Sequence, residues 1–161
     1  MSVSSKMCTH EDLVLIKLDA SDRRQVIGEM AERVLSKGLI TREFIDDVIE
    51  REQEYPTGLE FEIPIAIPHI GVGCNRSFLS LATLKTPVDF ESMDGSEKIL
   101  PVEIVVLFGI TNQDDQVDLL KKFIFAFQEV ENLKKIRAAG EPAEIIAMLD
   151  VLLDDCLDFT V

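Results

Sequence analysis

The stretch from Val102 to Ile110 (VEIVVLFGI) is almost continuously apolar, and no other part of the chain constrains the fold as strongly. A short run rich in branched apolar residues is typical of a central strand that is covered on both faces. Helical periodicity predicts the covering elements, over residues 22–37, 41–52, 117–127, 131–138 and 142–153. We therefore expect an α/β (α+β) fold, a three-layer α/β/α sandwich in which helices flank a mixed β-sheet of four to five strands.

Three further strands are expected before the central one, at residues 13–18, 63–67 and 78–84. Each is a short run of residues that favour strands, bounded by turn-forming residues. Pro87 and the turn Met93–Ser96 should separate the last of these strands from the central one, because proline cannot donate to a sheet.

The length of 161 residues fits one domain with a full-sized core. We expect residues 1–10 to be a flexible start and residues 11–161 to form a single domain. The net charge of −14 argues against nucleic acid or an anionic membrane as partner. No apolar run approaches the roughly 18–20 residues of a membrane span, and the start lacks the layout of a signal peptide. A cytoplasmic protein without membrane insertion is expected.

The three cysteines, Cys8, Cys74 and Cys156, follow no metal-ligand spacing and no disulfide framework. We therefore expect no metal and no cofactor. Residues 141–161 contain acidic residues but neither Lys nor Arg. Such a segment is either a solvated face or a surface that steers a basic protein partner.

A second apolar run, Ile63–Gly71, contains His69, one of the two histidines of the chain. Pro68 should end its strand, which would leave His69 at the strand end, followed by Gly71 and Gly73. Reactive residues are often placed in this way, aimed by a rigid element and exposed by a loop. The alternative is a histidine that serves only as a structural hydrogen-bonding residue.

Three short motifs precede and include this histidine: Arg51-Glu52, Pro56-Thr57-Gly58 and Ala66-Ile67-Pro68-His69. Together they resemble enzyme IIA of the fructose–mannitol–galactitol class, a component of the bacterial sugar phosphotransferase system (PTS EIIA type 2). The resemblance covers essentially the whole chain in order and length.

The resemblance implies a phosphotransferase. His69 would accept a phosphoryl group from the carrier protein HPr and pass it to a IIB component, which serves a IIC permease. Arg51 would attend the phosphorylation site. Many members have a second histidine where this chain has Gln116, and the segment from Thr57 to Ala66 is longer than in mannitol and fructose members. Both departures point to the galactitol-like subgroup.

The chemistry also follows from the residues. Neutral imidazole is a nucleophile and a good leaving group near pH 7. Arg51 could offer a bidentate positive fork to phosphoryl oxygens. Gln116 could donate an amide hydrogen bond, and the Thr57 hydroxyl and backbone N–H groups near Gly71 are further candidate donors. The structural alternatives are a surface ion pair for Arg51, turn formation for Thr57 and helix capping for Gln116.

Two other functions remain open at this point. Nitrogen-related members of the same family share the motif and act as regulatory proteins that signal through their phosphorylation state. A nucleophilic enzyme using Cys74 and His69 is a third possibility, although no acidic orienting residue or oxyanion motif accompanies the pair.

Overall fold

One mixed sheet organises the computed structural model, which describes residues 6–153 and 156–159. Within these residues the strands are β1 (Met7–Cys8), β2 (Val14–Leu18), β3 (Gly58–Leu59), β4 (Ile65–Ala66), β5 (His69–Ile70), β6 (Phe78–Glu91), β7 (Ile99–Gly109) and β8 (Leu157–Asp158). The helices are α1 (Arg23–Ser36), α2 (Arg42–Glu54), α3 (Gln116–Phe127), α4 (Val130–Ala138) and α5 (Pro142–Leu152), with the 3₁₀ turns η1 (Glu11–Leu13) and η2 (Gln113–Asp115).

The long antiparallel pair β6–β7 forms the centre of the sheet. Strands β1 and β2 run parallel to β6 on one side, and β8 continues the sheet beyond β1. Strands β4 and β5 run parallel to β7 on the other side, and β3 pairs antiparallel with β4. The predicted central strand is therefore confirmed as β7. The described sheet has eight strands rather than four to five, because several pairings involve only two residues.

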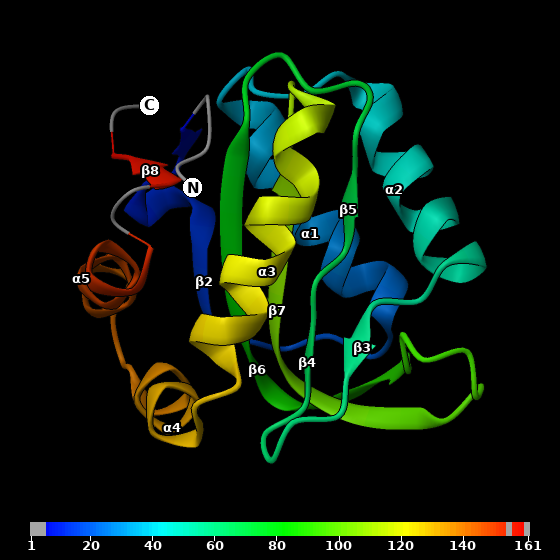
Figure 1. The fold of residues 1–161 in the computed structure, drawn as a ribbon, viewed down its shortest axis with the longest axis vertical. Helices are drawn as coiled ribbons and strands as arrows, with labels where there is room; N and C mark the ends of the chain where they lie inside the picture. The colour runs from blue at the N-terminus through cyan, green and yellow to red at the C-terminus, as the bar shows by residue number, and fades with distance from the viewer. Residues whose placement is uncertain (1–5, 154–155, 160–161) are drawn as a thin grey trace.

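Alternate residues of the sheet enter two separate hydrophobic cores. Val105 and Leu107 of β7 pack with α1 and α2 on one face. Ile104, Val106 and Phe108 point to the other face and pack with α3, α4 and α5. Figure 1 shows α3 crossing the front of the sheet, with α1 behind the sheet and α2 beside β5 at the right of the view. The predicted α/β/α sandwich is confirmed, and its cause is the period of two along a strand that is apolar on both faces.

Pro87 does not end the strand that contains it. Strand β6 continues to Glu91, and its register against β7 shifts between Thr83 and Val88. Residues 84–87 of β6 lie opposite the single residue 103 of β7. A bulge of this kind accommodates a proline, because the bulged residues leave the hydrogen-bond ladder. The predicted break before the central strand is wrong in this respect.

The strand predicted at residues 63–67 is divided into two short pairings. Ile65–Ala66 forms β4, and His69–Ile70 forms β5, both parallel to β7. Pro68 interrupts the pairing as expected, but its carbonyl accepts a hydrogen bond from Phe108 N at 3.2 Å. The chain therefore stays against β7, and His69 lies within a strand rather than beyond its end.

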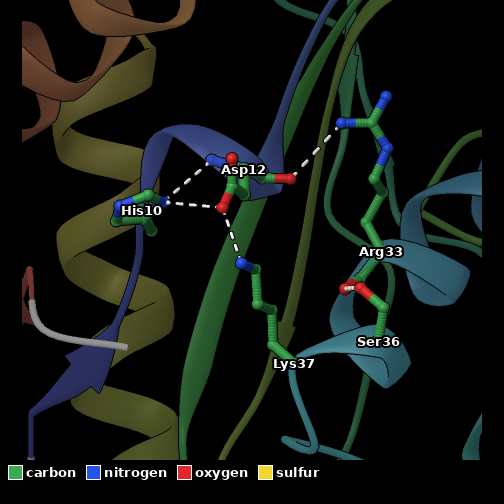
Figure 2. A network of polar contacts seen from close by, with 5 residues as sticks. All are labelled: His10, Asp12, Arg33, Ser36 and Lys37. Atoms are coloured by element: carbon green, nitrogen blue, oxygen red, sulfur yellow. Dashed lines mark hydrogen bonds and ion pairs between the residues drawn. The ribbon is translucent and has the colours of Figure 1, made fainter.

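The start of the chain is tied to the sheet and to α1. Met7 and Cys8 are fully buried, which differs from the flexible start expected for residues 1–10; residues 1–5 lie outside the described residues. Figure 2 shows the polar contacts that follow: His10 Nδ1 accepts from Asp12 N at 3.1 Å, and Lys37 Nζ donates to the Asp12 carboxylate at 2.6 Å. This network joins η1 to the end of α1.

The described helices lack the length and apolar character needed to cross a membrane.

Helix α1 begins after Asp22, whose carboxylate accepts from Gln25 N at 2.8 Å. Helix α2 begins after Thr41, whose side chain makes no cap bond. Thr41 N instead donates to Gly73 O at 2.9 Å, so the start of α2 fastens the loop that follows β5.

Candidate functional site

A surface pocket of about 310 Å³ opens where β5, the end of α2 and the start of α3 meet. Its lining consists of residues from these elements and the loop after β5: Arg51, His69, Ile70, Gly71, Val72, Gln113 and Gln116. The structure therefore brings together four of the five residues predicted for the site. Thr57 is the exception.

His69 is held by its own strand. Its Nδ1 lies 2.7 Å from the carbonyl oxygen of Ile67. A carbonyl oxygen can only accept, so Nδ1 carries the hydrogen and donates it. In the neutral ring this leaves the lone pair on Nε2. The peptide bond after Ile67 has no N–H because Pro68 follows, so its carbonyl is its only hydrogen-bonding group.

The surroundings of His69 keep its imidazole neutral. Burial of the ring lowers its pKa below the ordinary 6.5, and the nearby positive charge of Arg51 lowers it further, while the bond to Ile67 acts in the opposite direction. A ring whose pKa lies below 6.5 is mostly uncharged at pH 7. The Nε2 lone pair is then available to attack an electrophile.

Arg51 reaches the pocket from the last turn of α2. Its guanidinium lies over the ring of Tyr55, with 4.0 Å between Cζ and the ring centroid. This contact restricts the side chain while its N–H donors stay in the plane of the group. Among the described residues no ion pair involves Arg51, so the ion-pair alternative has no support in this structure.

Two glutamine amides approach the pocket from the region where α3 begins. Gln113, which we had not predicted, donates from Nε2 to the carbonyl of Gly71 at 2.9 Å. A Cβ at Gly71 would collide with the Gln113 amide, so only glycine allows this approach. Gln116 is the first residue of α3, and the residue at the N-cap position is Asp115. Gln113 belongs to the same polar segment as Gln116, which was the only sequence signal for it.

Thr57 does not line the pocket. It is buried, and its hydroxyl donates to Glu52 Oε1 at 2.7 Å while accepting from Ile67 N at 3.1 Å. The hydroxyl hydrogen is therefore already used within the protein. The geometry does not support our prediction that Thr57 donates to a bound phosphoryl group.

Cys74 is unsuited to nucleophilic catalysis. Its Sγ donates to Arg76 O at 2.8 Å, and burial raises the thiol pKa to about 11. The thiol is therefore protonated at neutral pH, and Cys74 is not part of the pocket lining. The alternative of a Cys74–His69 enzyme is wrong on this geometry. No group of three or more His, Cys, Asp or Glu residues in the described parts of the chain could hold a metal ion.

Fold and pocket together define a class of protein: an α/β/α sandwich that presents a neutral imidazole beside an arginine, which suits reversible bonding of an anionic group to nitrogen. The family described as "Phosphoenolpyruvate-dependent sugar phosphotransferase system, EIIA 2" matches residues 7–151 of this chain. The chain belongs to this family, which has the IIA role of a phosphoryl carrier.

Curated relatives carry several sugar specificities. The chain is 28% identical over 148 residues to the 2-O-alpha-mannosyl-D-glycerate-specific EIIABC component of Escherichia coli K12, covering 88% of this chain but only 22% of that protein. It is 23% identical to the mannitol-specific enzyme IIA component of Halalkalibacterium halodurans, covering 86% of this chain and 91% of that protein. It is 29% identical to the galactitol-specific EIIA component of Escherichia coli K12, covering 62% and 67%.

Solved structures share the fold. Enzyme IIAMTL in its complex with phosphorylated enzyme IIBMTL from Escherichia coli has a TM-score of 0.74 at 15% identity, covering 90% of this chain and 99% of that chain. The nitrogen regulatory protein IIA-Ntr from Neisseria meningitidis has a TM-score of 0.69 at 18% identity, covering 89% and 96%. The fold is thus common to transport and regulatory IIA proteins.

Proposed function

We propose that this chain is a phosphoryl carrier of a sugar phosphotransferase system that accepts its phosphoryl group on Nε2 of His69. The observation that carries the proposal is the bond from Nδ1 to the Ile67 carbonyl, which leaves the lone pair on Nε2. In the proposed step this lone pair forms an N–P bond with the phosphoryl group of phospho-HPr. The bond to the donor breaks, and its electron pair leaves with the donor. The proton on Nδ1 is retained and is still donated to the carbonyl oxygen of Ile67.

The remaining pocket residues are assigned to the phosphoryl oxygens. Arg51 would offer two parallel N–H donors to the transferring group, and the Gln116 amide would add a neutral donor. The backbone at Gly71 is held by Gln113, which fixes one wall of the pocket. Phosphoryl transfer requires mainly positioning and charge stabilisation, which this set of groups is able to supply.

The surface around the pocket suits transient docking of HPr and of a IIB component. Three large apolar side chains in or beside the pocket are more than half exposed: Val72, which lines the pocket, and Tyr55 and Val117, which adjoin pocket residues in the sequence. The likeness to a IIA chain found in complex with phosphorylated IIB supports a IIB acceptor for this chain. An apolar centre with a charged rim is typical of specific protein interfaces.

The transported substrate is proposed to be a polyol of the galactitol type. Gln116 in place of a second histidine, the long segment before His69 and the similarity to a galactitol-specific EIIA component support it. Transfer of phosphate from the phosphorylated chain to purified galactitol-type and mannitol-type IIB proteins tests this assignment. Transfer to neither would exclude both assignments and leave the regulatory alternative to be tested.

The central experiment is incubation with phosphoenolpyruvate, enzyme I and HPr, followed by mass spectrometry of the intact protein. We expect a gain of one acid-labile phosphoryl group, lost in His69→Ala and His69→Gln. The matched control is His10→Gln, because His10 is the only other histidine of the chain and lies in η1's cap, outside the pocket. Full labelling of His69→Gln would remove His69 from the proposed mechanism.

A further inference from the structure

We propose that Glu52 is a positioning residue that acts on His69 through Thr57 and Ile67, holding the imidazole in the tautomer that leaves Nε2 reactive. The proposal deepens the function given above, since it rests on His69 as the phosphoryl acceptor. Glu52 itself does not line the pocket, and its two carboxylate oxygens accept hydrogen bonds from Thr57.

Three hydrogen bonds in sequence connect the carboxylate to the imidazole. Thr57 Oγ1 donates to Glu52 Oε1 at 2.7 Å, and Ile67 N donates to Thr57 Oγ1 at 3.1 Å. The Ile67 carbonyl then accepts from His69 Nδ1 at 2.7 Å. A fourth hydrogen bond runs from Thr57 N to Glu52 Oε2 at 2.8 Å, so that Thr57 donates to both carboxylate oxygens of Glu52.

The coupling through Ile67 is geometric. Its N–H and its C=O belong to successive peptide units, so orienting the first constrains where the second points. Ile67 is fully buried, and its N–H is shared between Thr57 Oγ1 and the Thr57 carbonyl at 3.4 Å. Since Pro68 removes the next N–H, nothing else on that peptide unit can hydrogen-bond. The direction of the Ile67 carbonyl therefore decides which nitrogen of His69 is protonated.

The network needs Glu52 as an acceptor at both oxygens. The Thr57 hydroxyl has a single hydrogen, which it donates to Glu52 Oε1, and its oxygen accepts from Ile67 N with a lone pair. A proton on Oε1 would compete for the same place between the two oxygens. The ionised carboxylate removes this competition and makes the bond from Thr57 a strong, charge-assisted one.

Charged groups from two other elements face Glu52. Burial raises the pKa of Glu52 to about 7, the bonds from Thr57 and the charge of Arg23 on α1 oppose this, and Glu91 on β6 adds to it. Arg23 is itself paired with Glu91 across 3.9 Å. Glu52 thus changes protonation near neutral pH, and the capacity of its carboxylate oxygens to accept hydrogen bonds from Thr57 changes with it.

The test compares two variants with a conservative one. Thr57→Val removes the hydroxyl at nearly constant volume, and Glu52→Gln keeps one acceptor oxygen but loses the second. Thr57→Ser retains the hydroxyl. The matched control is Thr83→Val, which removes another buried hydroxyl. That hydroxyl accepts from Lys17 N at 2.9 Å, and Thr83 does not line the pocket. The readouts are the ¹⁵N chemical shifts of the His69 ring and the rate of phosphoryl transfer from phospho-HPr.

We expect the wild-type protein and Thr57→Ser to hold His69 as the Nδ1–H tautomer at pH 8, where Glu52 is mostly ionised. Thr57→Val and Glu52→Gln should populate the Nε2–H tautomer and transfer phosphate about tenfold more slowly, the effect of one lost hydrogen bond. In Glu52→Gln the tautomer ratio should also stop varying with pH between about 6.5 and 8.

Wild-type ring shifts in folded Thr57→Val would overturn the proposal, and this variant decides the matter even if Glu52→Gln fails to fold. The ring shifts do not depend on phosphorylation. If wild-type His69 were never labelled, the proposed function would fail while the link from Glu52 to the tautomer could still be measured.

Discussion

The imidazole of His69 lies flat on the ring of Phe108, with 4.6 Å between the ring centroids and 11° between their planes. The two residues are register partners on the parallel strands β5 and β7. Phe108 is in turn held edge-on by Phe123 of α3, at 4.8 Å and 81°. One face of the imidazole is therefore fixed by the core, and its Nδ1 edge is fixed by Ile67. Little freedom remains in the ring that we propose as phosphoryl acceptor.

The charge of Arg51 should matter more to the rate than to the fold. We expect Arg51→Ala to slow transfer from phospho-HPr by about two to three decades, corresponding to roughly 3–4 kcal/mol of lost transition-state stabilisation. Arg51→Lys should not restore the rate, because a point charge lacks the planar fork. Rapid-quench kinetics measures the effect.

Arg42→Ala is the matched control for Arg51, since Arg42 lies in the first turn of the same helix and, within residues 6–153 and 156–159, forms an ion pair only with exposed Glu32. Wild-type kinetics in Arg51→Ala would show that Arg51 has a structural role only.

The His69 ring should titrate below its ordinary pKa of 6.5, since burial and Arg51 both disfavour the charged form. Removing the guanidinium in Arg51→Ala should raise the pKa, because the repulsion between two cations is lost. NMR titration of the ring protons measures both values. A pKa above 6.5 in the wild-type protein, or an unchanged pKa in Arg51→Ala, would contradict the electrostatic link between these residues.

Buried Glu52 should make the protein less stable as the pH rises. Its pKa is about 7 in the folded protein against an ordinary 4.5, so the folded state holds this proton more tightly than the unfolded state. The resulting stabilisation is present below about pH 4.5 and is lost as the pH rises through 7; the difference amounts to about 3 kcal/mol. Urea unfolding between pH 5 and 8 measures it.

His69 acts in the opposite direction, because its lowered pKa favours the folded state at higher pH. We therefore compare His69→Gln with the double variant His69→Gln/Glu52→Gln. The free energy of unfolding should depend less on pH in the double variant than in His69→Gln. Parallel curves for the two proteins would mean that Glu52 does not titrate in this range.

Transfer under encounter-limited conditions should slow as salt is raised towards physiological ionic strength. The chain carries a net charge of −14, and screening over about 8–10 Å weakens attraction to a basic face of the proposed HPr partner. Of the acidic residues close to Gln116 in the sequence, Asp114 is exposed and Asp118 is partly exposed, whereas Asp115 is buried and cannot take part in the docking surface.

Stopped-flow transfer at two salt concentrations measures this effect. Asp114→Asn should reduce the salt dependence, and Asp150→Asn, an exposed position on α5, should leave it unchanged. A flat salt dependence in the wild-type protein would assign the acidic excess to solubility alone.

Much of the fold could be predicted from local patterns. Helical periodicity placed α1, α3 and α4 within one or two residues of their observed ends, and the apolar run at 102–110 predicted the central strand. Such patterns work because the period of burial along an element repeats in its own residues. The start of the chain and the course of β6 through Pro87 could not be predicted in this way, since both depend on a partner strand elsewhere in the chain.

Residue patterns along the chain were sufficient to predict the α/β/α class, the family resemblance and the association of His69 with Arg51. How these residues are used depends on the packed structure. In that structure Thr57 lies outside the pocket and Gln113 lines it. Hydrogen bonds through Thr57 and Ile67 link buried Glu52 to His69. The reason is physical: a hydrogen-bond partner is chosen by where the packed backbone places it, and the spacing of residues along the chain does not record that position.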